Sequence, residues 1–161
     1  MEIKKDKEII DALKILEPRL KDIKIRITGV DATILVDIGK ERLMPLPLAG
    51  LGMMKILRLI IYMLKASHGC VLIDEIEVGL HWKALLPIWQ LIEKIAEQYN
   101  VQVFATTHSL ECIHAAVEAF SNKEKFKLGI FRLEETKQGI KSVAYDENTI
   151  KAVLDNDLEV R

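Results

Sequence analysis

The stretch that decides the fold is Gly69-Cys-Val-Leu-Ile-Asp-Glu-Ile-Glu-Val-Gly-Leu80. Four uncharged, strand-forming residues, Cys70 to Ile73, are followed directly by Asp74 and Glu75. A run this short and apolar is typical of a fully buried strand, here with two acids at its carboxyl end. Adjacent carboxylates that leave water are unfavourable unless a metal ion or a basic group offsets them. The pair therefore indicates a functional site, although an Asp-Glu pair taken alone is more often a solvated turn.

The composition around this stretch is that of one soluble globular domain. The protein has 161 residues, 50% hydrophobic and 29% charged, and a net charge of -1 from 23 basic and 24 acidic side chains. This balance gives no support for a nucleic acid or a membrane as partner, although a local basic patch stays compatible with it. The amino terminus lacks the apolar core of a signal peptide, so we expect a cytoplasmic protein. Cys70 and Cys112 each lie in an apolar pattern, which predicts buried, reduced thiols.

The chain before the deciding stretch predicts a helix, a hairpin and a loop. Apolar residues at helical spacing predict a helix over 6–16, and alternation over 23–27 and 33–38 predicts a β-hairpin with one wet face. Two prolines and two glycines exclude regular structure over 45–52, which we expect to be a loop at a helix amino terminus. The helix over 53–66 is apolar almost all round and therefore belongs in a core. Its narrow polar stripe consists of Lys55, Arg58, Tyr62 and Lys65.

The chain after the deciding stretch predicts a second strand and two further helices. A helix is expected from about 83 to 99 with Pro87 in or near its first turn, then a buried strand over 101–105 and a helix over 110–120. Strand, helix, strand, helix indicates parallel strands with a right-handed crossover. A last hairpin over 127–145 and a short helix over 146–155 complete the chain. Trp82 and Trp89 are expected to be core or subunit-contact residues.

Both predicted strands deliver polar residues to one rim of the sheet, because ligands of open parallel sheets bind outside the carboxyl ends of the strands. An Asp beside a Glu suits a division of labour in which one carboxylate holds Mg²⁺ and the other polarises a water molecule. A histidine from the neighbouring strand can stabilise charge that develops on a phosphate. The rim residues are Asp74, Glu75 and Glu77 from the first strand and Thr106, Thr107, His108 and Ser109 from the second.

Three segments in this order resemble motifs of one family. Cys70 to Glu75 resembles the Walker B strand of ABC-type ATPases, Glu77 to His81 resembles the D-loop, and Ala105 to Ser109 resembles the H-loop or switch strand. Their order and spacing are similar to those of AAA-type ATP-binding proteins related to RecF, SMC and OLD-family ATPases. The resemblance covers residues 45–120 strongly and the ending at 158–161 more weakly.

The resemblance implies an α/β fold, a partial P-loop NTPase of the ABC type with parallel core strands, flanking helices and antiparallel hairpins at the margins. It implies that Asp74 is the Mg²⁺-associated carboxylate, Glu75 the general base for water attack, and His108 the switch histidine near the γ-phosphate of ATP. A homodimer in the ATP-bound state is the implied assembly. The positions implied to contact the nucleotide are Gly50, Gly52 and Gly79.

The sequence departs from the family pattern in two places. Residues 48–52 keep the glycines of the signature loop without its serine, so phosphate contact there would come from backbone N–H groups, or the glycines only ease a tight turn. No Gly-x-x-x-x-Gly-Lys-Ser/Thr P-loop occurs in the 161 residues. We therefore expect the carboxyl-terminal portion of one ATPase domain, divided as 1–44, 45–120 and 121–161. A fragment or a split subunit of this kind needs a P-loop half, or the full-length protein, to hydrolyse ATP.

Two other functions stay open. One is a non-catalytic, ATPase-like module that dimerises and regulates. The other is a metal-dependent hydrolase or nuclease with a carboxylate-rich site made of Asp74, Glu75, Glu77 and His81, although ordinary surface polarity is the simpler interpretation of Glu77 and His81. Lys55 and Arg58 are most simply exposed, with a phosphate- or DNA-facing role open. A role in DNA maintenance or defence is suggested by the family alone.

Overall fold

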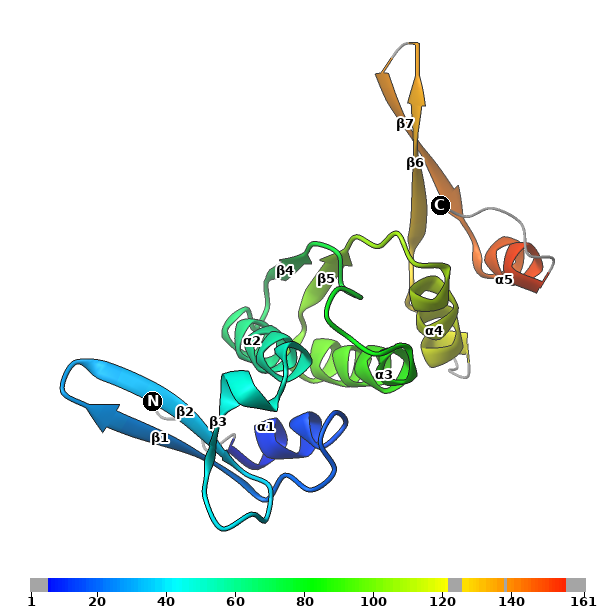
Figure 1. Ribbon diagram of the computed structural model, residues 1–161. Helices are drawn as coiled ribbons and strands as arrows, with labels where there is room; N and C mark the ends of the chain where they lie inside the picture. The colour runs from blue at the N-terminus through cyan, green and yellow to red at the C-terminus, as the bar shows by residue number, and fades with distance from the viewer. Residues whose placement is uncertain (1–5, 122–125, 138, 156–161) are drawn as a thin grey trace.

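The computed structural model describes residues 6–121, 126–137 and 139–155. Figure 1 shows α2 and α3 beneath a short pair of strands, β4 and β5, while the β1–β2 hairpin extends to one side and the β6–β7 hairpin upward on the other. The elements in chain order are α1 (Asp6–Leu13), β1 (Asp22–Thr28), β2 (Asp31–Asp37), β3 (Met44–Pro45), the 3-10 helix η1 (Leu46–Ala49), α2 (Leu51–Lys65), β4 (Cys70–Ile73), α3 (Trp82–Tyr99), β5 (Gln102–Ala105), α4 (Leu110–Ser121), β6 (Ile130–Thr136), β7 (Gly139–Tyr145) and α5 (Glu147–Asp155).

The centre of the fold is the parallel pair β4–β5, joined through helix α3. Val71 is paired with Val103 and Leu72 with Phe104, so the two strands end side by side at Ile73 and Ala105. The prediction of parallel core strands with flanking helices and antiparallel hairpins is confirmed. Because both strands run the same way, their carboxyl ends form one rim, and that rim positions the candidate site.

Only one face of this pair is covered, so the prediction of fully buried strands is wrong. Val71 is buried towards the helices, whereas Leu72 is 77% exposed and its partner Phe104 is 52% exposed. Cys70 lies on the same open face as Leu72, because side chains two apart in a strand point the same way, and it is exposed. The expectation of two buried thiols therefore holds for Cys112 alone.

In the amino-terminal third, the predicted hairpin is present, but the segments before and after it differ from the prediction. Strands β1 and β2 pair antiparallel, and β3 adds a short third strand at Met44–Pro45. The segment expected to be irregular contains this strand and the 3-10 helix Leu46–Ala49, whose N-cap is Pro45. Pro47 is the second residue of the 3-10 helix, where a missing N–H removes no helical hydrogen bond. Helix α1 ends at Leu13, three residues before the predicted end.

Helices α2, α3 and α4 supply most of the core. Helix α2 buries six side chains, as expected of a helix that is apolar almost all round. Pro87 lies inside α3 as its sixth residue, just past the first turn and so near it as predicted. Trp89 is buried and belongs to the core, whereas Trp82 at the start of α3 is 65% exposed. The fully buried residues shared by these helices include Ile56, Ile60, Met63, Ile88 and Cys112.

The carboxyl-terminal part is a second antiparallel hairpin followed by a helix, as predicted. Strands β6 and β7 pair from Ile130↔Tyr145 to Thr136↔Gly139. Helix α5 buries Ile150 and Leu154 against Ile113 and Val117 of α4. The predicted family-like ending at 158–161 lies outside the described residues.

Candidate functional site

The turn that follows β4 is fastened to the end of β5 by backbone hydrogen bonds. The Thr106 N–H donates to the Ile73 carbonyl at 2.9 Å, and the Ile76 N–H donates to the Thr106 carbonyl at 3.0 Å. The Ile76 side chain is buried and anchors the turn in the core. Asp74 and Glu75, just before this anchor, have exposed side chains. The expectation that burial forces a cation on these two acids is therefore wrong, since both remain in contact with water.

Thr106 joins the two acids to β5. Its hydroxyl donates to Asp74 Oδ1 at 2.6 Å and accepts from the Glu75 N–H at 2.8 Å. A hydroxyl can donate once and accept twice, so one side chain orients the Asp74 carboxylate and satisfies the Glu75 backbone at the same time. Thr106 was expected at the rim, but nothing in the sequence assigned it this bridging role.

Glu75 adopts a backbone conformation that is unusual for its residue type. Its φ is +45°, in the left-handed region that residues other than glycine rarely adopt. This conformation costs about 1–2 kcal/mol, so the contacts around the turn must offset it. Such outliers cluster at functional sites, where the surrounding structure holds them.

Glu77 links the turn to the residues after β5. Its Oε1 accepts from the His108 N–H at 2.9 Å. Burial raises the pKa of Glu77, but hydrogen bonds from the His108 N–H and the Thr107 hydroxyl and the charge of Lys55 outweigh it, and the pKa lies below its ordinary value. Glu77 is thus an ionised brace between the two strand ends. The simpler interpretation of Glu77, surface polarity, misses this role.

Lys55 reaches the same turn from helix α2. Its Nζ donates to the Glu75 carbonyl at 2.6 Å and to the Val78 carbonyl at 2.9 Å. Burial lowers the pKa of Lys55, although the charges of Glu77 and Glu75 oppose the change. The prediction that Lys55 belongs to an exposed stripe is wrong, whereas Arg58, on the same helix, is exposed as expected.

The three predicted glycines lie where α2 begins and where the turn ends. Gly50 precedes α2 with φ +111°, and Gly79 has φ +79°, so both need the conformational freedom of glycine. A Cβ at Gly52 would lie 3.1 Å from the Gly79 carbonyl oxygen, so α2 and the turn are in close contact there. The close packing at this contact explains why residue 52 is small.

Two other polar residues of the rim begin helices. The His81 ring accepts from the Lys83 N–H at 3.2 Å and stacks on Trp82, which makes it the N-cap of α3. The Ser109 hydroxyl accepts from the Cys112 N–H at 3.1 Å, three residues on, as an N-cap of α4 does. The sequence could have indicated the Ser109 cap, because serine before a run with helical periodicity is a common N-cap, whereas His81 is not a preferred N-cap residue.

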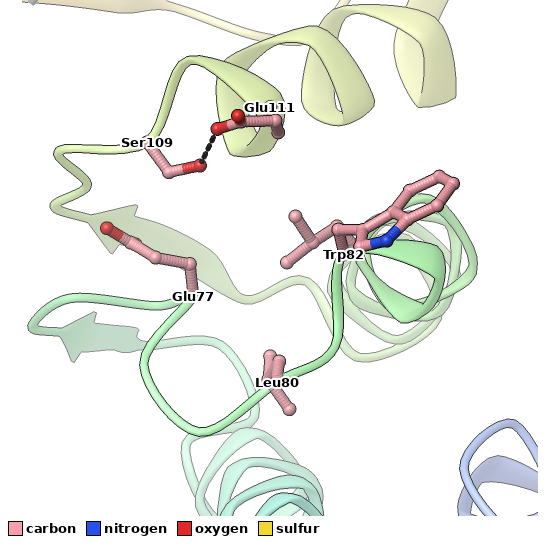
Figure 2. Close-up of a pocket in the computed structure, with 6 residues that line it drawn as sticks. Glu77, Leu80, Trp82, Ser109 and Glu111 are labelled. Carbon is pink, nitrogen blue, oxygen red and sulfur yellow. Dashed lines mark hydrogen bonds between the residues drawn. The ribbon is translucent and has the colours of Figure 1, made fainter.

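A hollow of about 400 Å³ lies between the turn and the starts of α3 and α4. Figure 2 shows Glu77 and the hydrogen-bonded pair Ser109 and Glu111 on one side of it and Leu80 and Trp82 on the other. Leu85 completes the lining. The hollow therefore combines an apolar wall with a carboxylate edge.

A metal cage made wholly of protein side chains does not form in the part of the chain that the structure describes, because no three His, Cys, Asp or Glu side chains gather there. The four side chains of the metal-dependent hydrolase hypothesis thus do not form one site. Asp74 does fit Mg²⁺ as a single ligand: Thr106 engages only its Oδ1, and the side chain is exposed. Mg²⁺ commonly takes one or two protein carboxylates, with waters and substrate phosphates as its other ligands.

Residues 2–113 match the family model described as "AAA domain, putative AbiEii toxin, Type IV TA system". The chain belongs to this AAA family. The match includes the β4 turn, β5 and the start of α4, so the Asp74, Glu75 and His108 positions all lie within the AAA match. No curated protein matches the sequence.

Solved structures of SMC ATPase heads share the fold of this AAA chain. One comes from a study of ATP-driven dimerization and DNA-stimulated activation of SMC ATPases. It has a TM-score of 0.66 at 11% identity, and the match covers 94% of this chain and 89% of the SMC chain. An SMC head bound to the C-winged helix domain of ScpA has a TM-score of 0.64 at 13% identity, with 91% and 44% covered. A Pyrococcus furiosus SMC head with an extended coiled coil has a TM-score of 0.60 at 12% identity, with 94% and 37% covered.

The likeness shows that this AAA chain has the α/β fold of the SMC structures. The chain spans most of the first SMC chain but less than half of the second and third. Within the described residues, no helix is long and apolar enough to cross a membrane.

Proposed function

We propose that this AAA chain supplies the water-activating side of an ATP hydrolysis site, completed by a P-loop segment that its 161 residues do not contain. The observation that carries the proposal is the bridge from Thr106 to Asp74 and Glu75, which gathers two exposed acids at the rim where β4 and β5 end. His108 follows β5 at the same rim, and its backbone is tied to Glu77.

The residues then divide the chemistry. Glu75, whose side chain is exposed at the rim, accepts the proton of the attacking water as general base. Asp74 would hold Mg²⁺, which would supply positive charge to neutralise the charge that develops on the phosphates. The exposed His108 ring can donate to the γ-phosphate, and Gly50, Gly52 and Gly79 bring backbone groups near the nucleotide. The Glu77 brace keeps His108 in a fixed relation to the turn.

The open face of β4–β5 is evidence that a further segment packs there in the complete protein. Parallel sheets occur almost only with both faces covered, and a two-stranded pair is marginal by itself. Leu72 and Phe104 are large, apolar and exposed on that face, and each strand has one unpaired edge among the described residues. We infer that further strands of a P-loop segment, from the full-length protein or a separate subunit, pair at this edge.

The test of the proposal is reconstitution. A P-loop-containing segment from the same genome neighbourhood, mixed with this chain, is expected to restore ATP hydrolysis that neither part shows alone. Glu75→Gln should retain ATP while turnover falls by about 100-fold or more, because removal of a general base costs about 10²–10⁴-fold. Glu118→Gln, an exposed change on α4, is the matched control. Normal turnover by Glu75→Gln in an active assembly would sink the mechanism.

Cys70 offers a separate test of the inferred pairing. It is exposed on the open face, so a thiol reagent should label it in the isolated chain. Assembly with the P-loop segment should slow that labelling, because added strands would cover the face. Undiminished labelling in an assembly that hydrolyses ATP would show that the segment docks elsewhere.

The descriptions of similar proteins are the basis for proposing dimerisation and a role that involves DNA. One related structure is described by ATP-driven dimerization and DNA-stimulated activation of SMC ATPases, and the family description names a toxin of a Type IV TA system. We propose an ATP-dependent homodimer of the completed protein, in the cytoplasm, with a role in DNA maintenance or defence. ATP-dependent change in mass by light scattering, with and without DNA, tests these steps.

A non-catalytic regulatory module is the second candidate. The observation that favours it is the absence, from these 161 residues, of both a P-loop and the signature serine. Such a module would assemble with its partner equally well as Glu75→Gln and as wild type, and neither assembly would hydrolyse ATP.

A further inference from the structure

The turn between β4 and α3 is held from two opposite sides. Thr106 and the His108 N–H hold it from the β5 side, through Asp74, Glu75 and Glu77. On the other side, the contacts come from α2, where the close approach of Gly52 to Gly79 is reinforced by the ammonium group of Lys55. Asp74 and Glu75, the two acids of the proposed site, therefore sit in a segment whose geometry depends on α2.

We propose that Lys55 is a positioning residue that holds Glu75 in its working orientation by binding the two carbonyl groups that begin and end the Glu75–Val78 turn. This inference deepens the proposed function and rests on it for the role of Glu75. Lys55 acts on the backbone, so it touches neither the nucleotide nor the attacking water.

The geometry of the two hydrogen bonds carries the argument. The Glu75 carbonyl accepts from both Lys55 Nζ, at 2.6 Å, and the Val78 N–H, at 3.1 Å, so the ammonium group binds at the closure of the turn. The second bond, to the Val78 carbonyl at 2.9 Å, prevents the turn from rotating about the first. Bonds from a charged donor are about twice as strong as neutral ones, which suits a turn that must keep Glu75 at a positive φ.

The surroundings of Lys55 support this role over an ordinary surface role. Its side chain is half-buried, and burial lowers its pKa, so the amine has given up water for the two carbonyl groups. The acids Glu75, Glu77 and Asp74 all lie near enough to favour its charge. Arg58, in contrast, is exposed one turn further along the same helix.

The first test is hydrogen exchange on the isolated chain. In Lys55→Met, which keeps the aliphatic stem, we expect the Ile76 and Val78 amides to exchange about 10- to 100-fold faster, the range expected for losing a hydrogen bond to a charged group. Protection along α2 and α3 should stay as in wild type. Lys55→Arg keeps the charge and several donors and should restore most of the protection. Arg58→Met is the matched control and should change neither amide.

The second test uses the assembly completed with a P-loop segment. Lys55→Met should lower kcat about tenfold or more and leave KM for ATP unchanged, because a displaced general base affects the chemical step alone. A merely structural role would lower the amount of folded protein without this split. The inference is overturned if the Ile76 and Val78 amides keep wild-type protection in Lys55→Met, or if the loss spreads over all of α2.

The two tests separate the inference from the proposed function. If the wild-type assembly does not hydrolyse ATP, the proposed function fails, and the exchange measurement still decides whether Lys55 holds the turn.

Discussion

The Thr106 hydroxyl offers the sharpest stability test, because it makes two hydrogen bonds that a single substitution removes. Thr106→Val keeps the β-branched shape that suits a strand end and deletes only the hydroxyl. The change removes the 2.6 Å bond to Asp74 Oδ1 and the 2.8 Å bond from the Glu75 N–H. We expect the chain to become less stable and the turn to become looser.

The magnitude follows from the two partners. A hydrogen bond to a charged group contributes about 1.5–3 kcal/mol and a neutral one about 0.5–1.5 kcal/mol. Asp74, Glu75 and Thr106 are exposed, so water replaces the lost partners and the lower end of each range applies. The sum is about 2 kcal/mol, which at a urea slope of about 2 kcal/mol/M lowers the midpoint by about 1 M.

Urea unfolding followed by circular dichroism measures the change directly. Thr106→Ser keeps the hydroxyl and should lose much less than Thr106→Val. Thr33→Val on β2 is the matched control, since Thr33 is exposed and its hydroxyl makes no hydrogen bond within the described residues. Equal midpoints for wild type and Thr106→Val would refute the bridging role of Thr106.

Three further predictions concern the scaffold around the site. Gly50→Ala should destabilise the chain by about 1–3 kcal/mol, because φ +111° and ψ 151° suit glycine almost alone even though no atom crowds the position, and a loss below about 0.5 kcal/mol in urea unfolding would contradict this. Ile60→Ala, 1% exposed in α2, should cost about 2–5 kcal/mol by the same measurement, and the half-buried neighbour Ile61→Ala should cost less. Hydrogen bonds from Arg19 lower the pKa of Glu17 to about 2. The contribution of Glu17 to stability is therefore full above pH 4.5 and is lost as the pH falls towards 2. Arg19→Ala should return the pKa of Glu17 towards 4.5 in an NMR titration, and an unchanged pKa would refute the pairing.

Most of the fold follows from local pattern. Alternation and helical spacing predicted both hairpins, the parallel pair and the helices, because periodicity reports which face of an element meets the core. The errors lie where pattern does not determine environment. An apolar run such as Cys70 to Ile73 reads as buried on both faces, yet Leu72 is exposed, since residues alone do not say whether anything covers the second face.

The rim positions of Asp74 and Glu75 could be predicted from the sequence, and the contacts that hold them could not. Asp74, Glu75 and His108 each follow a short apolar strand, and parallel strands of this kind place the residues after them at one rim. The chemical roles of these residues stay predictions. Lys55 was assigned to an exposed stripe because its spacing fits one, and only the folded chain brings its amine to carbonyl groups 20 and 23 residues away. Long-range contacts of this kind leave no local signature.

The open face of β4–β5 has a consequence for the life of the chain in a cell. Unpaired strand edges and bare apolar surface are templates for association with other chains, so a surplus of this polypeptide would be a client for chaperones and a substrate for proteases. Its abundance would then follow the supply of whatever segment covers Leu72 and Phe104. Co-expression with a segment that covers this face should raise the recoverable yield of the chain, because the exposed apolar surface would then be buried.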